Sequence, residues 1–373
     1  MNMMMTVLAL ALSLPVHAAP PFQVGQTTRA IVPPAVRDWR AAQTQALITQ
    51  IWYPTAAGQT AQANDIGPPG RAVFIGHPLV AGAAVAAGRH PLIMLSHGTG
   101  GSAPSLDWLA AALAARGYVV AGVNHPGNNA LEALTREGFE RPWERATDIG
   151  NALDAVLADP QFAPHIDAAR IGAAGFSLGG YTVLALAGAR TDMRAFAAFC
   201  ASPEADAICT PPEAAALAII PRSASINSSD GDGSAASERA SAASLRDARI
   251  GAVFALAPAL GQAFDGPSLR AVRIPVALVS GDGDTTVPLA TNHVHIARLL
   301  GHARSTIMPG GVSHYTFLAP CTPAAQRMLA DLCTDAPGVD RSAVHARTVE
   351  LAASFFGQAL GTGSVLAGQQ RMP

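Results

Sequence analysis

A serine between glycines is the residue of this chain best placed to act as a nucleophile. Ser177 lies in Arg170–Ala187, RIGAAGFSLGGYTVLALA, with Gly175 before it and Gly179 after it. The apolar run Ile171–Phe176 is too short for a helix and suits a buried strand, and apolar residues recur at helical spacing after the serine. A turn from strand directly into helix would present the hydroxyl at a tight bend. The alternative is an ordinary strand–helix turn without chemistry, which only partner residues can exclude.

A serine hydroxyl becomes a good nucleophile only with a general base within hydrogen-bond reach. Gly-x-Ser-x-Gly at such a turn is typical of the nucleophile elbow of α/β-hydrolases, in which the acid and then the histidine follow the serine. His314 is our candidate because it lies in a loop after a predicted strand, where ligands bind in open α/β sheets. The other histidines after a plausible acid lie in or at the end of amphipathic helical runs: His293, His295, His302 and His345.

Two aspartates compete to orient that base. The strand Ile274–Ser280 is followed by GDGDTTVP, which contains Asp282 and Asp284. Asp284 lies closer to the next predicted helix, whose start Thr285 and Thr286 can cap themselves. We therefore predict Asp284 as the acid, with helix capping as the alternative role of either aspartate.

Donors for an oxyanion are expected from two backbone N–H groups. One is that of Leu178, directly after the serine, and the other comes from the glycine-rich loop after the strand Pro91–Ser96. Within that loop we choose the N–H of Thr99, and we expect His97 to brace the loop. A phosphate cradle is the alternative, but the loop lacks the lysine and the spacing of a P-loop.

Strand-like and helix-like segments alternate from Pro91 onward, which predicts a mostly parallel sheet with helices on both faces. The predicted strands are Pro91–Ser96, Tyr118–Val123, the Ile171 strand, Ile250–Leu256, Ile274–Ser280 and Ala303–Met308. The predicted helices are Ser105–Arg116, Trp143–Ala158, the one after Ser177, Leu289–Leu300 and Arg341–Phe356. Ala46–Tyr53 alternates like an antiparallel edge strand.

Residues 191–247 break this rhythm with a low-complexity stretch rich in Ser, Gly, Asp and Ala. We expect a mobile insertion after the nucleophile helix, either a solvated loop or a lid over the site. The remainder shows no repeat and no composition shift, so residues 19–373 are predicted to form a single domain.

The composition excludes several classes of function. Half of the 373 residues are hydrophobic, 13% are charged and the net charge is −2, which argues against nucleic-acid binding. The chain contains no lysine, so Schiff-base and P-loop lysine chemistry are ruled out. His293 and His295 lie two residues apart on a predicted helix, so their side chains would point to different sides, unlike a pair that binds a metal ion. We expect neither a metal nor an organic cofactor.

The N-terminus predicts export. Residues 1–18 have an apolar core, Val7–Leu14, followed by a small-residue cleavage site at Ala18, as in a signal peptide. The core is too short to span a membrane, and an uncleaved apolar N-terminus is the alternative. The four cysteines lie in two local pairs, Cys200 with Cys209 and Cys321 with Cys333. In an exported protein they suggest two disulfides, although four cysteines allow three connectivities.

Several motifs together resemble the bacterial exported proteins called predicted dienelactone hydrolases, which are related to platelet-activating-factor acetylhydrolases. They are SHGTGGS, GYVVAGVNHPGN, RIGAAGFSLGG, IPVALVSGDGDTTVP and GGVSHYTFLAPC. The resemblance spans about Gln45 to Phe356. It implies an α/β-hydrolase fold, the triad Ser177, Asp284 and His314, and the oxyanion donors Thr99 and Leu178. True dienelactone hydrolases have cysteine where this chain has Ser177, so the resemblance implies no substrate.

These inferences predict a periplasmic or secreted serine hydrolase that cleaves small carboxylic esters through an acyl-enzyme. Acyl transfer or amide cleavage by the same triad is the nearest alternative. A catalytically silent α/β-hydrolase scaffold used for binding is another. We expect no nucleic-acid partner and no stable membrane insertion, and the oligomeric state is left open.

Overall fold

A computed structural model describes residues 21–35, 37–214 and 230–361. The predicted signal peptide, residues 1–18, lies outside the described residues. Of the insertion, residues 215–229 also lie outside them. None of the described helices is long and apolar enough to cross a membrane.

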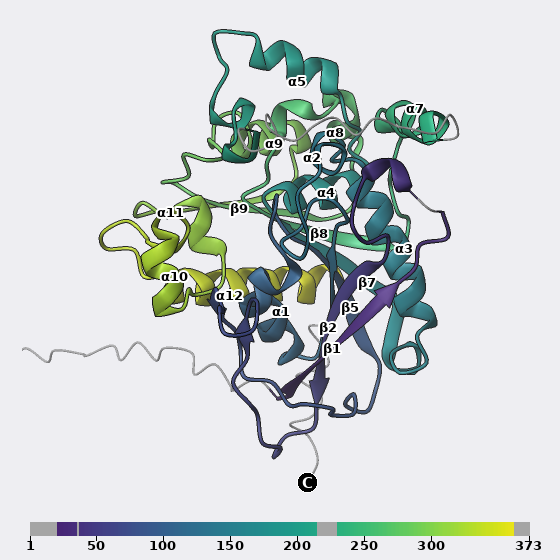
Figure 1. Cartoon of the computed structure of the whole chain (residues 1–373), viewed down its shortest axis with the longest axis vertical. Helices are drawn as coiled ribbons and strands as arrows, with labels where there is room; N and C mark the ends of the chain where they lie inside the picture. The colour runs from purple at the N-terminus through teal and green to yellow at the C-terminus, as the bar shows by residue number, and fades with distance from the viewer. Residues whose placement is uncertain (1–20, 36, 215–229, 362–373) are drawn as a thin grey trace, which may run out of the picture.

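The core of the molecule is an eight-stranded sheet of order β1-β2-β6-β5-β7-β8-β9-β10 (Figure 1). β1 pairs with β2 and β2 with β6 in antiparallel fashion, and the other neighbours are parallel. The strands are β1 (Gln23–Ile31), β2 (Leu47–Thr55), β5 (His90–Ser96), β6 (Val119–Asn124), β7 (Ile166–Phe176), β8 (Ile250–Leu256), β9 (Val276–Gly281) and β10 (Arg304–Met308). The prediction of a mostly parallel sheet is therefore confirmed. A separate pair, β3 (Asp65–Ile66) and β4 (Phe74–Ile75), was not predicted.

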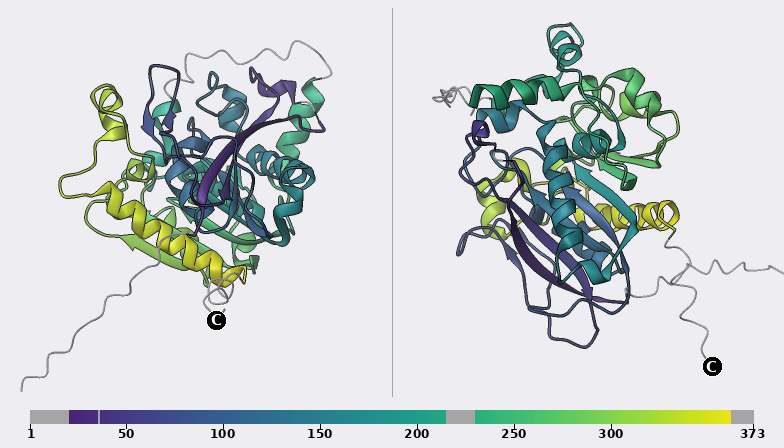
Figure 2. Two further views of the ribbon diagram at one scale, coloured as in Figure 1. Left: turned by 90° about the horizontal axis from the view of Figure 1, so that it is seen from below. Right: turned by 90° about the vertical axis from the view of Figure 1, so that its right-hand side faces the viewer.

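Helices cover both faces of the sheet, as Figure 1 and the two views of Figure 2 show. The α-helices are α1 (Asp107–Ala114), α2 (Arg136–Glu140), α3 (Glu144–Ala158), α4 (Leu178–Ala187), α5 (Met193–Cys200), α7 (Asp230–Ser241), α8 (Gly266–Ala271), α9 (His293–Leu300), α10 (Pro323–Met328), α11 (Ala330–Cys333) and α12 (Arg341–Ala359). Short 3₁₀ turns are η1 (Asp38–Arg40), η2 (Ala103–Leu106), η3 (Ala163–His165), η4 (Ala207–Cys209), η5 (Gly261–Ala263) and η6 (His314–Phe317).

The side-chain alternation of the strands divides the buried residues into two cores. In β5, Leu92 and Met94 face the cluster that includes residues of α3, α4, α8 and α9. Ile93 and Leu95 face the other cluster, formed with α1 and α12. Because both faces are covered, the central strands contain continuous apolar runs, such as Ile171–Phe176 of β7, as parallel strands of α/β proteins do. The sheet is thus a rigid support for the loops at its carboxyl edge.

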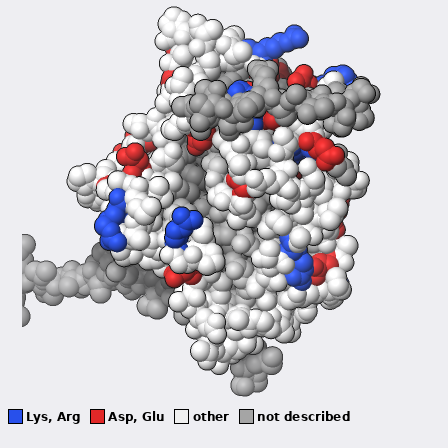
Figure 3. All heavy atoms as spheres, in the orientation of Figure 1, with Lys and Arg blue, Asp and Glu red and all other residues white. Residues whose placement is uncertain are grey.

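The insertion has more structure than its composition predicts. Its described parts contain α5, η4 and α7. α7 is fixed to the start of α3, since the Ser237 hydroxyl donates to Glu144 at 2.5 Å and accepts from the Trp143 indole at 2.9 Å. Figure 3 shows one face of the molecule with only scattered charges of both signs, in keeping with the low charged fraction.

Candidate active site

Ser177 lies at the sharp turn between β7 and α4 with φ 56° and ψ −119°, a conformation that few residues other than glycine adopt. The glycines on either side permit the close packing of this turn. A Cβ on Gly175 would lie 2.1 Å from the carbonyl oxygen of Gly179, and one on Gly179 would lie 1.9 Å from that of Ser96. The turn therefore has the strand–turn–helix geometry that exposes a nucleophile.

The structure brings Ser177, His314 and Asp284 together from three separate loops. His314 Nε2 is 3.0 Å from the Ser177 hydroxyl oxygen, and His314 Nδ1 is 2.7 Å from Asp284 Oδ2. The other carboxylate oxygen of Asp284 accepts the backbone N–H groups of Thr286 and Val287 at 3.1 and 2.7 Å. The carboxylate is thereby fixed in position. The side chains of Ser177, His314 and Asp284 form a hydrogen-bonded row, and all three are buried.

Asp282, the competing aspartate, has a different environment. Its carboxylate is exposed and accepts the N–H groups of Gly310 and Gly311 at 3.0 and 2.7 Å. These glycines belong to the loop that leads to His314. Asp282 therefore braces this loop and does not touch the imidazole ring.

The predicted oxyanion donors face the same pocket as Ser177. Thr99 and Leu178 both line it, and no acceptor for either backbone N–H is found within the described part of the chain. The neighbouring N–H of Gly100 is occupied, because it donates to the Asn128 side chain at 2.8 Å. Two donors beside the nucleophile are thus available for a ligand oxygen.

A segment that sequence reasoning assigned no role holds the Thr99 loop in place. It is Asn124–Asn128, part of the VNHPGN stretch. Asn124 accepts the N–H of Ala103 at 2.9 Å, and Asn128 also donates to the Gly138 carbonyl at 3.1 Å. The concentration of polar side chains directly after a buried strand was the available signal.

His97 and His125 lie side by side beneath this loop, with ring centroids 5.1 Å apart. Burial together with the positive charge of Arg145 lowers the pKa of His125 to about 3 and holds that of His97 well below its usual value. Both rings are therefore neutral at pH 7. His125 Nδ1–H donates to Asp148 at 2.9 Å, and Nε2 accepts from the Ser96 hydroxyl at 3.0 Å. The expected bracing role of His97 agrees with this environment.

A buried ionic cluster centred on Asp148 of α3 supports the histidines. Burial alone would raise the pKa of Asp148, but Arg40 and Arg37 hold it well below its usual range. Arg145, also fully buried, donates to the His97 carbonyl, and burial lowers its pKa to about 9. The cluster connects η1 and α3 to the loop that carries Thr99.

Asp148→Asn should destabilise the protein strongly, because Arg40 would lose its buried counter-charge and Arg37 would keep only Glu144. We expect the free energy of unfolding to fall by about 3–5 kcal/mol, measured by urea denaturation. Asp154→Asn on the same helix is the matched control. Its carboxylate is exposed and paired with Arg249, so the expected loss is below about 1 kcal/mol. Similar losses for both variants would contradict the role of the cluster.

Two aromatic residues hold the loop that carries His314 from behind. Trp108 of α1 donates its indole N–H to the Phe317 carbonyl at 3.0 Å, and His345 of α12 bonds the Thr316 carbonyl at 2.8 Å. The two rings stack with centroids 3.9 Å apart. The sequence places His345 in an amphipathic helical run, where a solvated or half-buried histidine is usual. It is buried because the apolar face of α12 packs on α1.

A pocket of about 630 Å³ opens beside Ser177 and His314. Its walls are mostly apolar and include residues of the Thr99 loop, α2, the insertion and the segment after His314. The larger apolar side chains among its lining are Phe74, Phe139, Phe176, Met193, Phe196, Ile208, Leu318, Leu329 and Leu332. No cluster of potential metal ligands is found in residues 21–35, 37–214 and 230–361.

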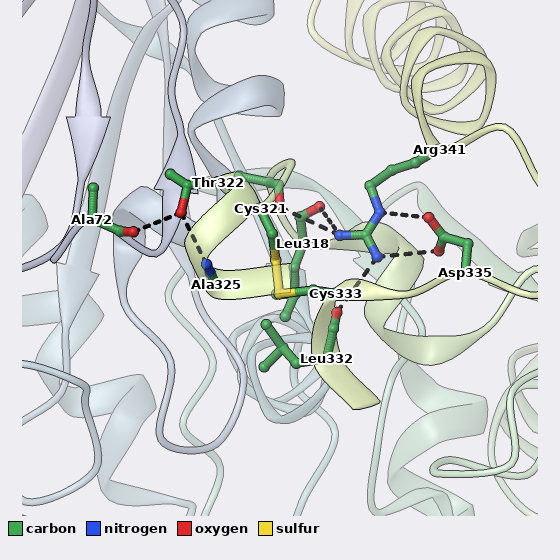
Figure 4. The surroundings of a disulfide bond; sticks show 10 residues. Ala72, Leu318, Cys321, Thr322, Ala325, Leu332, Cys333, Asp335 and Arg341 are labelled. Atoms are coloured by element: carbon green, nitrogen blue, oxygen red, sulfur yellow. Dashed lines mark hydrogen bonds and ion pairs between the residues drawn. A yellow bond between two sulfur atoms is a disulfide. The ribbon is translucent and has the colours of Figure 1, made fainter. Parts of the chain in front are cut away.

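Both predicted disulfides are present, and each closes a segment that lines this pocket. Cys200 is bonded to Cys209 within the insertion, and Cys321 to Cys333 after His314. Figure 4 shows the surroundings of the second disulfide. There Arg341 pairs with Asp335 and donates to the carbonyls of Leu318, Ala319 and Leu332, while Thr322 donates to that of Ala72.

Removing the Cys321–Cys333 disulfide should weaken both the fold and the pocket. Loop closure of this length is associated with about 2–3 kcal/mol in the chain-entropy model. We expect the Cys321→Ser/Cys333→Ser double variant to lose this much stability in denaturant unfolding. It should also show lower activity, because Leu318, Leu329 and Leu332 line the pocket. If the double variant kept the melting temperature and the kinetics of the wild type, this expectation would be wrong.

Comparison with known proteins relates the chain to enzymes. A family model described as PET hydrolase-like matches residues 75–209, which include Ser177 but neither Asp284 nor His314. Cutinase est2 of Thermobifida alba is 33% identical over 105 residues, or 28% of this chain and 32% of the cutinase. Lipase 1 of Moraxella sp. (strain TA144) is 35% identical over 91 residues, or 24% of this chain and 25% of the lipase. The chain thus spans about a third or less of the relatives it matches.

A ferulic acid esterase structure from Streptomyces cinnamoneus resembles the whole chain, with a TM-score of 0.60 and 93% of each chain covered at 21% sequence identity. The chain has the α/β-hydrolase fold. In this fold Ser177 follows a strand at the centre of the sheet, and Asp284 and His314 follow β9 and β10. The chain order of serine, acid and base is the one typical of the fold.

Proposed function

We propose that this chain is a serine hydrolase that cleaves carboxylic esters. The observation that carries the proposal is the hydrogen-bonded row in which His314 joins the Ser177 hydroxyl, at 3.0 Å, to the Asp284 carboxylate, at 2.7 Å. The row lies beside an apolar pocket large enough for a small organic ester. The names of the relatives, which are cutinase, lipase and ferulic acid esterase, support an ester as the substrate.

Each group has a defined part in the proposed reaction. The Ser177 oxygen attacks the ester carbonyl carbon while His314 Nε2 takes its proton, and Asp284 holds Nδ1–H and stabilises the imidazolium. The N–H groups of Thr99 and Leu178 stabilise the negative charge that develops on the carbonyl oxygen. His314 then protonates the leaving alcohol, which leaves an acyl-enzyme on Ser177. Water activated by His314 releases the acid and restores the serine.

A panel of 4-nitrophenyl esters of increasing acyl length tests this function. We expect hydrolysis of at least the shorter esters, with the initial rate followed by nitrophenolate absorbance. Covalent labelling by a fluorophosphonate is the second arm, because a binding scaffold has no reason to keep an activated serine. Adding an acceptor alcohol, or replacing the ester with an anilide, separates hydrolysis from acyl transfer and amide cleavage. If the protein were not labelled and hydrolysed none of the esters, the proposal would be refuted.

The setting of the enzyme is part of the proposal. We propose export to the periplasm or the medium, supported by the N-terminal pattern of residues 1–18 and by the two disulfides. We also propose that residues 19–373 form one domain in which residues 191–214, the described first part of the insertion, act as a lid. Met193, Phe196 and Ile208 support the lid because they line the pocket. The motifs resemble those of predicted dienelactone hydrolases, which are related to platelet-activating-factor acetylhydrolases. This resemblance supports the triad in the proposal and no particular substrate.

A further inference from the structure

The charges around the pocket are of one sign. Among the residues that line it, the formally charged side chains are Glu140 and Glu213, and no arginine belongs to the lining found in the described part of the chain. The sequence has no lysine that could add a positive charge. A substrate therefore meets apolar walls, the His314 ring and two carboxylates.

The two carboxylates differ in their partners. Glu140 is exposed and forms an ion pair with Arg136 at 3.1 Å, which offsets its charge. Glu213 is half-buried, just after the Cys200–Cys209 loop. No hydrogen bond or ion pair to its carboxylate is found in residues 21–35, 37–214 and 230–361. Among the described residues, the charge of Glu213 is therefore less offset by a neighbour than that of Glu140.

Glu213 lines the same pocket as the proposed base, His314. Tyr315, the residue after His314, also lines the pocket. Burial raises the pKa of Tyr315, and the negative charge of Glu213 raises it further, as do those of Asp284 and Asp331. Glu213 and the loop that carries His314 therefore both face the space that a substrate would occupy.

We propose that Glu213 makes the pocket select against negatively charged esters, so that the substrates are uncharged or cationic esters. The inference rests on the proposed ester hydrolysis and adds the charge of the substrate to it. An ester with its own carboxylate would lose hydration on entering the apolar pocket and would find no cation among the described lining residues to compensate. It would also be repelled by Glu213, at a cost set by the partly screened Coulomb interaction.

Two 4-nitrophenyl esters of matched shape test the charge selection. The 4-nitrophenyl ester of 5-methylhexanoic acid ends in an uncharged isopropyl group, and the mono-4-nitrophenyl ester of glutaric acid ends in a carboxylate at the same position. The readout is the ratio of kcat/KM for the neutral ester to that for the anionic ester, after subtraction of the spontaneous reaction. Glu213→Gln is the test variant. Glu204→Gln is the control, since Glu204 belongs to the same insertion and is exposed outside the pocket lining.

We expect the wild-type ratio to be at least about tenfold and to fall about tenfold in Glu213→Gln, as the removal of one nearby like charge predicts. Glu204→Gln should keep the wild-type ratio. A wild-type ratio near one, or an unchanged ratio in Glu213→Gln, would overturn the charge selection while ester hydrolysis stood. If neither ester were hydrolysed, the ester-hydrolase function would be overturned, and this inference with it.

Discussion

Ser177→Ala is expected to lower kcat on 4-nitrophenyl esters by about 10⁴–10⁶-fold. The hydroxyl is the atom within hydrogen-bond reach of His314, and an alanine leaves the base with no nucleophile to activate. The variant should keep the wild-type melting temperature or exceed it, because one buried oxygen is lost and no cavity of consequence is made. Steady-state kinetics and thermal unfolding of the same preparation measure the two effects.

Ser241→Ala is the matched control for this experiment. Ser241 is a half-buried serine at the end of α7, and its hydroxyl donates to a carbonyl of its own helix. Its loss should change kcat less than twofold. If Ser177→Ala retained wild-type turnover, the assignment of the nucleophile would be wrong.

Asp284→Asn is expected to lower kcat by about 10⁴-fold. An amide at this position carries no charge to stabilise the imidazolium, and it favours the wrong tautomer of His314. The melting temperature should change little, since the amide oxygen can still accept the N–H groups of Thr286 and Val287. The kinetic and the structural effects are therefore separable in one variant.

Asp282→Asn distinguishes the two aspartates. Its carboxylate braces Gly310 and Gly311, so the variant should lose about 1 kcal/mol of stability and keep most of its activity. The comparison uses kcat for both variants under one set of conditions. If Asp282→Asn were the crippled variant, the acid would be Asp282 and the hydrogen bond between Asp284 and His314 would have no catalytic meaning.

Much of the fold could be predicted because the strands of this sheet are buried on both faces. Ile250–Leu256 is predicted and observed with the same bounds, since an apolar run of that length between a polar segment and Pro258 leaves little choice. The helix predicted at Leu289–Leu300 begins later, at His293. There the loop that carries Asp284 continues farther than the pattern of apolar residues indicates. Helix ends depend on such local contacts, which sequence periodicity does not contain.

The insertion shows where composition misleads. Its Ser- and Ala-rich stretch predicts little burial, yet Ser237 of α7 is buried against Trp143 and Glu144. A small hydroxyl-bearing residue serves this contact well because it can both donate and accept. The sequence cannot reveal such a partner, since Glu144 lies far away along the chain.

Sequence motifs predicted Ser177, Asp284 and His314, but they did not predict the buried residues that support the site. The chemistry of a triad restricts residue type and chain order, so few candidates remain. The buried cluster of Arg145, Asp148 and His125 obeys no such rule. Charged residues on a predicted helix are ordinarily assigned to its solvated face, and only the packing of α3 beneath the Thr99 loop places these inside.

The left-handed backbone of Ser177 implies a trade-off between stability and activity. A residue with a side chain in such a sparsely populated conformation costs on the order of 1–3 kcal/mol, which the surrounding packing of β7 and α4 must offset. Glycine would relieve that cost and abolish the hydroxyl at the same time. The most stable sequence for this backbone is therefore a silent one, and efforts to make the protein more robust should leave position 177 untouched and look for gains away from the turn.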